Sequence, residues 1–343
     1  MGDTPLHRCR TAWLGAMLVS LVAAVVAAPA PGPSAPMAQP DKAAAATGER
    51  PCPPRPPSPS AAQVQALQRE ARDHGLLWRL QRDGRTSYLY GTLHVGRLEW
   101  VAPGPQLSAA LRETDTLALE LDPGDPAVQR ELAAGLARRA DALTPSAAQR
   151  AQLQRQTEAA CLPPAALAAL HPLMQAMTLM LLDARWVGLD PSFGQEMLLS
   201  QAARAAGRPV VSLETVALQL GILIPDDPAL AQARFEQALA QLGDRRARAV
   251  TQRLASAWAE GRLDELEDYE AWCDCIDSPQ DRDFMRRVND DRNPAIAGAI
   301  VARHAQGQRL LAAVGALHMT GPKALPRLLQ QHGFQVERVV FTR

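Results

Sequence analysis

Short apolar runs, some of them alternating with polar residues, predict the strands of this chain. Two of these runs flank Arg82-Asp83-Gly84, and a tight turn with glycine between two such runs is typical of a β-hairpin. The other runs are short and closed by glycine or proline, which predicts buried strands. The predicted strands cover residues 76–80, 86–92, 116–122, 209–213, 309–315 and 335–341.

Helical periodicity occupies most of the chain between these strands. A long helical pattern from residue 126 to residue 182 is interrupted only where prolines occur. We therefore expect a fold of the α/β (α+β) class, with a mixed central β-sheet built from both ends of the chain and a large helical insertion between them. The other predicted helices cover residues 61–72, 106–113, 195–206, 227–242, 245–260, 263–273, 279–304 and 322–331.

The first 28 residues have the pattern of a secretory signal peptide. His7, Arg8 and Arg10 precede an apolar run from Thr11 to Ala28, and small residues follow. An uncleaved membrane anchor is the alternative, because the run is nearly long enough to span a bilayer. We expect an exported chain, periplasmic or secreted, with no stable membrane insertion once the signal is removed.

Residues 29–60 are rich in proline, alanine and serine. They lack the apolar area needed to order themselves, which predicts a disordered linker. The folded domain is then expected to span residues 61–343. Lysine and arginine total 36, as do aspartate and glutamate, and the absence of a basic excess argues against nucleic acid as a partner.

Four cysteines remain after the signal is removed, an even number that suits an oxidising compartment. A bond between Cys273 and Cys275 would close a tight ring, so we expect Cys52 and Cys161 to be bridged to that pair, in either order. A metal site is the alternative, but Cys-x-Cys with two distant cysteines lacks the spacing of a zinc finger.

The pattern Gly-x-x-His occurs at the end of two predicted strands, as Gly91 to His94 and as Gly315 to His318. Glu120 and Glu214 also lie at or just beyond the ends of predicted strands. In open α/β sheets, ligands bind at the edge where the strands have their C-terminal ends. We therefore expect all four side chains to share one crevice. The glycines would allow a sharp turn or the close approach of a ligand.

Each of these residues also has a plainer interpretation. Either histidine alone is more often a hydrogen-bonded structural residue, and Glu214 is placed to cap the following helix. A buried unpaired charge at Glu120 would be costly, which favours a role for it. Arg292 and Asn293 lie in a helical pattern, where a solvated face or a stop before Pro294 is the simplest account. The remaining residues of interest are expected to be surface or structural (His74, His171, His304, His332) or to lie in the core (Trp258, Trp272, Tyr269).

Two imidazoles and one carboxylate, with an open position for water, are a common set of ligands for a catalytic divalent metal. We expect His94, Glu120 and His318 to bind such an ion, which lowers the pKa of bound water to about 7 and polarises a carbonyl. Mn²⁺, Co²⁺ and Zn²⁺ are the expected candidates. Glu214 is the second carboxylate, either ligand or general base, and Arg292 is expected to stabilise a developing oxyanion or to hold substrate.

Short motifs follow one another over nearly all of residues 76–340. They are Leu77-Trp78, Tyr88 to Gly96, Leu117 to Asp122, Gly188 to Asp190, Gly207 to Thr215, Asp291 to Asn293 and Val314 to Pro322. In this order and spacing the chain resembles the TraB/GumN family, which includes the Tiki proteins. The resemblance is greater to the bacterial GumN branch, with its exported single domain, than to the membrane-anchored animal members.

The resemblance implies an α/β fold related to erythromycin-esterase-like and haem-uptake ChaN-like proteins. Tiki members are regarded as metal-dependent proteases that use both Gly-x-x-His histidines and a glutamate. The matching positions are His94, His318 and Glu120, with Arg292 and Asn293 as supports of the site. The expected function is therefore an exported metal-dependent hydrolase, a peptidase acting on proteins or peptides. The alternatives are a metal-free esterase-like hydrolase, and a haem-, metal- or polysaccharide-binding protein linked to exopolysaccharide production.

Overall fold

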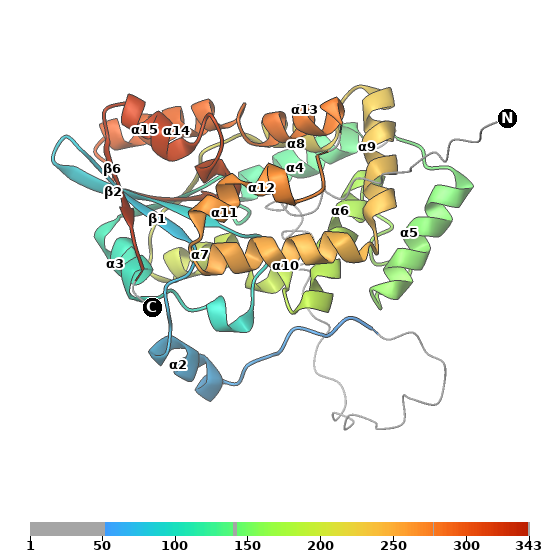
Figure 1. Cartoon of the computed structure of the whole chain (residues 1–343), viewed down its shortest axis with the longest axis horizontal. Coiled ribbons are helices and arrows are strands. Elements are labelled where there is room, and N and C mark those ends of the chain that lie inside the picture. Colours follow the sequence, from blue (N-terminus) through green and yellow to red (C-terminus); the bar gives the residue numbers. More distant parts are fainter. Residues whose placement is uncertain (1–51, 140–142, 277, 342–343) are drawn as a thin grey trace.

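A mixed six-stranded β-sheet lies in the part of the chain that the computed structural model describes, residues 52–139, 143–276 and 278–341. Its strand order is β4-β3-β5-β2-β1-β6. The strands come from both ends of the chain with helices between them, which confirms the predicted α/β class (Figure 1). They are β1 (Leu76–Arg82), β2 (Arg85–Thr92), β3 (Thr116–Leu119), β4 (Val210–Ser212), β5 (Leu310–Gly315) and β6 (Gln335–Val339).

The two Gly-x-x-His segments leave the sheet side by side. β2 and β5 are parallel neighbours, in a register that pairs Gly91 with Val314 and Thr92 with Gly315. On its other side β5 is parallel to β3, which is parallel to β4 in turn; β1 is antiparallel to both β2 and β6. Because parallel neighbours end at the same edge, the residues that follow these four strands meet at one edge of the sheet.

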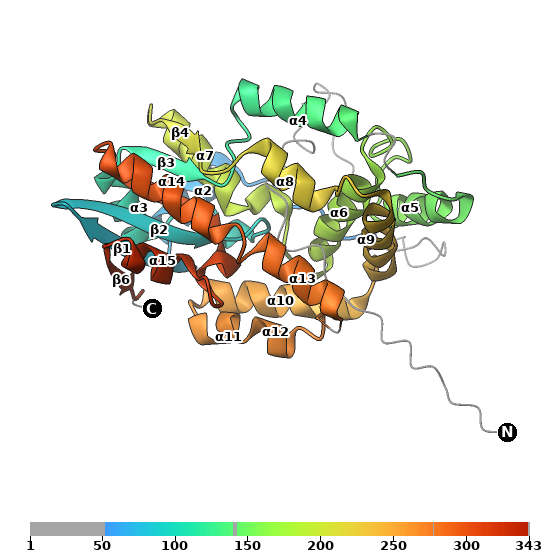
Figure 2. The ribbon, with the colours of Figure 1, turned by 90° about the horizontal axis from the view of Figure 1, so that it is seen from above.

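Helices cover both faces of the sheet, as parallel strands require. α14 (Asn293–Ala305) and α15 (Leu325–Gln331) pack on one face, and α3 (Pro105–Glu113) and α7 (Gln195–Ala205) on the other (Figures 1 and 2). The central strand β5 is apolar on both sides and fully buried from Leu310 to Val314. As predicted, Trp258 and Tyr269 are buried in the core, and Trp272 packs against it.

The helical insertion forms the other end of the molecule. Helices α5 (Ala147–Ala159), α6 (Pro172–Asp183) and α9 (Pro228–Gln241) lie at the end away from the hairpin of β1 and β2 (Figure 1). Among the described residues between β3 and β4 there are four α-helices, namely α4 (Pro126–Arg138), α5 (Ala147–Ala159), α6 (Pro172–Asp183) and α7, with two short 3-10 helices between α6 and α7. The chain from β4 to β5 holds α8 (Val216–Leu223), α9 (Pro228–Gln241), α10 (Arg245–Ala259), α11 (Leu263–Glu267), α12 (Tyr269–Trp272), α13 (Pro279–Val288) and α14.

The single helix predicted for residues 279–304 is wrong. The structure has two helices there, α13 and α14, with a break at residues 289–292. Pro294 lies at the start of α14, where its missing N–H costs nothing, whereas inside a continuous helix it would remove a hydrogen bond and clash with the preceding turn. The break matters for the site, because Arg292 and Asn293 stand at the new helix start.

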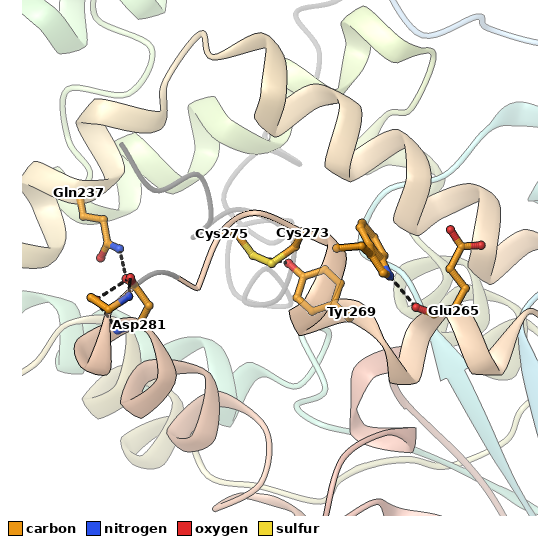
Figure 3. Close-up of a disulfide and its surroundings, with 8 residues drawn as sticks. Gln237, Glu265, Tyr269, Cys273, Cys275 and Asp281 are labelled. Carbon is orange, nitrogen blue, oxygen red and sulfur yellow. Dashed lines mark hydrogen bonds between the residues drawn. A yellow bond between two sulfur atoms is a disulfide. The ribbon is translucent and has the colours of Figure 1, made fainter. Parts of the chain in front are cut away.

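The predicted disulfide pairing is also wrong. Cys52 is bonded to Cys161, and Cys273 is bonded to Cys275. Asp274 adopts a left-handed conformation with φ of 50°, so the chain turns back and the Cα atoms of Cys273 and Cys275 lie 5.0 Å apart, an ordinary separation for a disulfide. Figure 3 shows this bridge beside the buried ring of Tyr269.

The predicted signal peptide, residues 1–28, lies outside the described residues, as does most of the predicted linker. The described end of that linker, residues 52–60, contains neither helix nor strand. Helix α2 (Ala61–Arg69) follows, with a capping box formed by Ser60 and Gln63. Among the helices that the structure describes, none combines the length and the apolar character needed to cross a membrane.

His171 is buried at the N-terminus of α6, where its Nδ1 accepts a hydrogen bond of 3.3 Å from the N–H of Leu173. Burial, with a smaller contribution from the charge of Arg139, lowers the pKa of His171 to about 4. The unfolded chain takes up this proton near pH 6.5 and the native state only near pH 4. Neutral His171 therefore makes its full contribution to the free energy of unfolding above pH 6.5, and this contribution is lost as the pH falls toward 4.

Replacement of His171 by asparagine should make the stability of the protein less dependent on pH between pH 6.5 and pH 4. Asparagine retains an N-cap acceptor but has no proton to gain. The melting temperature of H171N should fall less than that of the wild type between pH 7 and pH 4. The exposed His332 provides the control, since H332N should keep the wild-type slope; equal slopes for H171N and the wild type would contradict the prediction.

Candidate active site

The structure brings His94, Glu120, Glu214 and His318 to one edge of the sheet. Glu120 follows β3 directly, and the other three lie within three residues of the ends of β2, β4 and β5. All four are buried, with exposures of 3–8%. His94 and His318 line one hollow together with Gly315.

Gly315 allows this close assembly. Its N–H donates a hydrogen bond of 2.8 Å to Oε1 of Glu120. A Cβ at this position would lie 3.3 Å from the same oxygen and 3.6 Å from Cδ2 of His318. The glycine of the second Gly-x-x-His pattern therefore leaves room for the carboxylate beside the histidine.

Arg292 joins the two glutamates. It is only 1% exposed, and its Nη2 donates to Glu120 at 2.5 Å and also to Glu214. Its Nε donates to Glu214 at 2.9 Å, and its Nη1 donates to the carbonyl of Val288 at 3.0 Å. Every nitrogen of the guanidinium thus donates a hydrogen bond within the protein, and the guanidinium holds both carboxylates in fixed positions.

The charge of Arg292 keeps Glu120 ionised. Burial acts to raise the pKa of this carboxyl group, but Arg292, with smaller contributions from His318 and His94, lowers it to about 2. The carboxylates in turn raise the pKa of Arg292 despite its burial. Arg292 is thus the cation that the two buried carboxyl groups share.

Asn293 orients His318. Its Oδ1 lies 2.5 Å from Nδ1 of His318, and its Nδ2 donates to the carbonyl oxygens of His318 and Lys323. Burial and then the charge of Arg292 lower the pKa of His318 to about 3. At neutral pH the ring is therefore neutral, with its proton on Nδ1 and its Nε2 lone pair on the side of Glu120.

Glu196, in the first turn of α7, is a partner of His94 that the sequence analysis missed. Its Oε1 lies 3.2 Å from Nδ1 of His94 and also accepts a hydrogen bond from Thr92. Burial lowers the pKa of His94, but Glu196 outweighs it and raises the value to about 9. An acidic residue in a first helical turn is common for helix stability alone, so the sequence carried little signal for this role.

Gln219 was also missed. Its Nε2 donates to Glu120 at 3.3 Å and to Glu214 at 3.0 Å. It is the only polar residue in the otherwise apolar helix α8, and its burial means that such a side chain needs a partner. That isolated polar position was a usable signal.

Two features of the site suit a divalent metal ion. Each histidine has its Nδ1 against an acceptor, which leaves Nε2 as the nitrogen available to a metal, and such outer partners usually accompany metal-binding histidines. In addition, Nε2 of His318 lies 3.6 Å from Oε1 of Glu120. Two donors at about 2.1 Å from a tetrahedral ion lie about 3.4 Å apart, so this pair fits in type and spacing.

The third predicted ligand is not grouped with this pair. Among the residues described, no three His, Cys, Asp or Glu side chains lie close enough together to hold a metal ion. Both oxygens of Glu120 also accept hydrogen bonds already, from Gly315 on one side and from Arg292 and Gln219 on the other. Of the three predicted ligands, only His318 and Glu120 are therefore placed to bind one metal ion. His94 lines the same hollow as His318 but is not grouped with this pair.

Comparison with known proteins identifies the family. The model of the TraB/PrgY/gumN family matches residues 76–338, a range that contains every residue of the site. No curated protein and no solved structure matches the chain. The chain belongs to the TraB/PrgY/gumN family.

Proposed function

We propose that this protein is an exported hydrolase that cleaves peptides or proteins with the help of a divalent metal ion. The observation that carries the proposal is the buried group of His94, Glu120, Glu214 and His318 around Arg292 at one edge of the sheet. Burying two carboxylates, a guanidinium and two imidazoles is costly, and such groups with displaced pKa values are typical of active sites. Family membership supports the proposal without naming a substrate.

In this proposal the pair of His318 and Glu120 would hold the metal, either Mn²⁺, Co²⁺ or Zn²⁺, and His94, the third ligand expected from the sequence, lines the same hollow as His318. When bound, such an ion polarises a carbonyl and lowers the pKa of water. Glu214 serves as a further ligand or as the general base that takes a proton from water. Arg292 positions both carboxylates, and Asn293 keeps the Nε2 atom of His318 free of its proton.

A metal-free hydrolase is the second candidate. It is supported by the two oxygens of Glu120, which already accept hydrogen bonds, and by the opposite pKa shifts of the two histidines. His318, with a pKa of about 3, is neutral, whereas His94, with a pKa of about 9, carries a proton. The protonated imidazole of His94 would act as general acid, whereas His318 is too weak a base at this pKa, so Glu214 would be the group that takes a proton from water.

Removal of metal distinguishes the two candidates. The purified protein should cleave members of a fluorogenic peptide library, lose that activity after dialysis against EDTA, and regain it on addition of Mn²⁺, Co²⁺ or Zn²⁺. Activity unchanged by EDTA, in protein shown by elemental analysis to be metal-free, would select the metal-free hydrolase. Absence of cleavage with any peptide under all these conditions would contradict the peptidase, and absence of cleavage with any ester as well would contradict the metal-free hydrolase.

Export is proposed from the signal-like residues 1–28 and from the two disulfides, which persist in oxidising compartments. The mass of the protein recovered from a periplasmic or culture fraction should match a chain cleaved near residue 28. A full-length mass in the membrane fraction would favour an anchor, and recovery in the cytosol would contradict export.

A further inference from the structure

An apolar pocket opens beside His94, and His318 is not among the residues that line it. It lies between the end of α6, the end of α9 and one face of α10. His94 lines both this pocket and the hollow that contains His318, so the two spaces adjoin. Its apolar wall consists of Met180, Leu181, Ala184, Leu242, Ala247 and Leu254.

Gln241 lines this pocket at the last residue of α9. It is 2% exposed, yet neither its Nε2 nor its Oε1 has a hydrogen-bond partner among the described residues. Other glutamines of the same helix do have partners: Gln237 donates to Asp281 at 2.5 Å (Figure 3), and Gln232 donates to Glu236 at 2.6 Å. A buried amide without partners costs about 1–3 kcal/mol, and such a group in a native protein calls for an explanation.

Each charged residue of the pocket is paired, His94 with Glu196 at 3.2 Å and Arg248 with Asp183. Nε and Nη2 of Arg248 each donate to the carboxylate of Asp183 at 2.7 Å. The guanidinium also lies 5.3 Å from the ring of Trp186. A bidentate pair of this kind offers little net charge to a ligand, so the pocket presents an apolar wall, one unpaired amide and no net charge from this pair.

We propose that this pocket binds an uncharged, apolar side chain of the peptide substrate, next to the bond that is cleaved, and that Gln241 hydrogen-bonds the main chain of that residue. The inference rests on the proposed function and adds the substrate class. A peptide group has one N–H and one C=O, which match the Oε1 and Nε2 of the unpaired amide. An apolar side chain removes its own surface from water in the pocket. A lysine or glutamate would lose hydration without gaining an unpaired opposite charge, because Arg248 is paired with Asp183 and His94 with Glu196.

Gln241→Leu tests the role of the amide. Leucine has a similar volume and no polar atom, so this variant should keep the fold and melt at the wild-type temperature or above, because an unpaired buried amide has been removed. KM for a peptide with leucine at the varied position should rise about tenfold, with kcat nearly unchanged. Gln252, exposed on α10, gives the matched control, since Q252L should leave both constants unchanged.

Ala247→Phe tests the pocket. Ala247 is half-buried on α10 and lines the pocket, so the larger ring should fill it and leave the rest of the helix in place. The wild type should cleave library peptides with Leu, Met or Phe at one position beside the scissile bond at least tenfold faster than those with Lys or Glu. In A247F the preference should move to Ala or Gly.

The failure of this inference differs from failure of the proposed function. If the wild type cleaves peptides and both Q241L and A247F leave the sequence preference and KM unchanged, the pocket assignment is wrong and the hydrolase proposal stands. If no peptide is cleaved, binding of N-acetyl-leucinamide decides: weakening by Q241L and A247F, with no binding of N-acetyl-lysinamide, supports the pocket. Equal binding of both amides by all variants would overturn it.

Discussion

Replacement of Arg292 by methionine is expected to lower the free energy of unfolding by about 3–5 kcal/mol. Methionine fills most of the space but leaves Glu120 and Glu214 without the cation that they share. Two carboxylates buried close together cannot both stay charged at low cost. The measurement is urea denaturation, and the slope of the unfolding transition should stay near the wild-type value if the native fold is kept.

The double replacement E120Q/E214Q in the R292M background should recover part of the lost stability. Neutral amides need no counter-charge, so removal of the carboxylates should offset removal of the cation. The exposed Arg282 on α13 provides a matched control, since R282M should change the free energy of unfolding by less than about 0.5 kcal/mol. A loss in R292M no larger than in R282M would show that the buried charges do not depend on Arg292.

The sequence was sufficient to predict which residues lie at the edge of the sheet, because this prediction depends only on neighbouring positions in the chain. Each strand is a compact apolar run, and the residue that ends it lies next to it in the chain. The positions of His94, Glu120, Glu214 and His318 therefore followed from strand ends and from the rule that parallel strands end together. The sequence did not predict the register between β2 and β5. In this register Thr92 pairs with Gly315, which places the two histidine segments side by side.

The supporting residues of the site were harder to predict. Glu196 contacts His94 from a helix more than a hundred positions along the chain, and nothing local distinguishes it from a residue that stabilises a helix start. The break before α14 was hidden for a similar reason: residues 279–304 have continuous helical periodicity, and only Pro294 marks the restart. The disulfide error came from treating Cys-x-Cys as too tight, whereas a single left-handed residue, Asp274, makes that ring possible.

Loss of Nε2 from either histidine is expected to lower kcat/KM for a cleaved peptide by about a thousandfold or more. Asparagine at residue 318 keeps an amide group near the former Nδ1, so the contact with Asn293 survives while the atom on the side of Glu120 is lost. H94N does the same next to Glu196. If the two rings act on one substrate, the double variant H94N/H318N should lose hardly more than either single variant, because groups that work as a unit are not additive.

Glutamine at the same positions provides the complementary test. Its amide lies near the former Nε2 and no longer makes the contact that Nδ1 made. H318Q should therefore retain more activity than H318N if the Nε2 position carries the chemistry, and less if the Asn293 contact alone matters. H332N, on an exposed helix end, should match the wild type. Losses of H94N and H318N that multiply in the double variant would mean that the histidines serve separate steps or separate sites, which is incompatible with one shared hollow as the reaction centre.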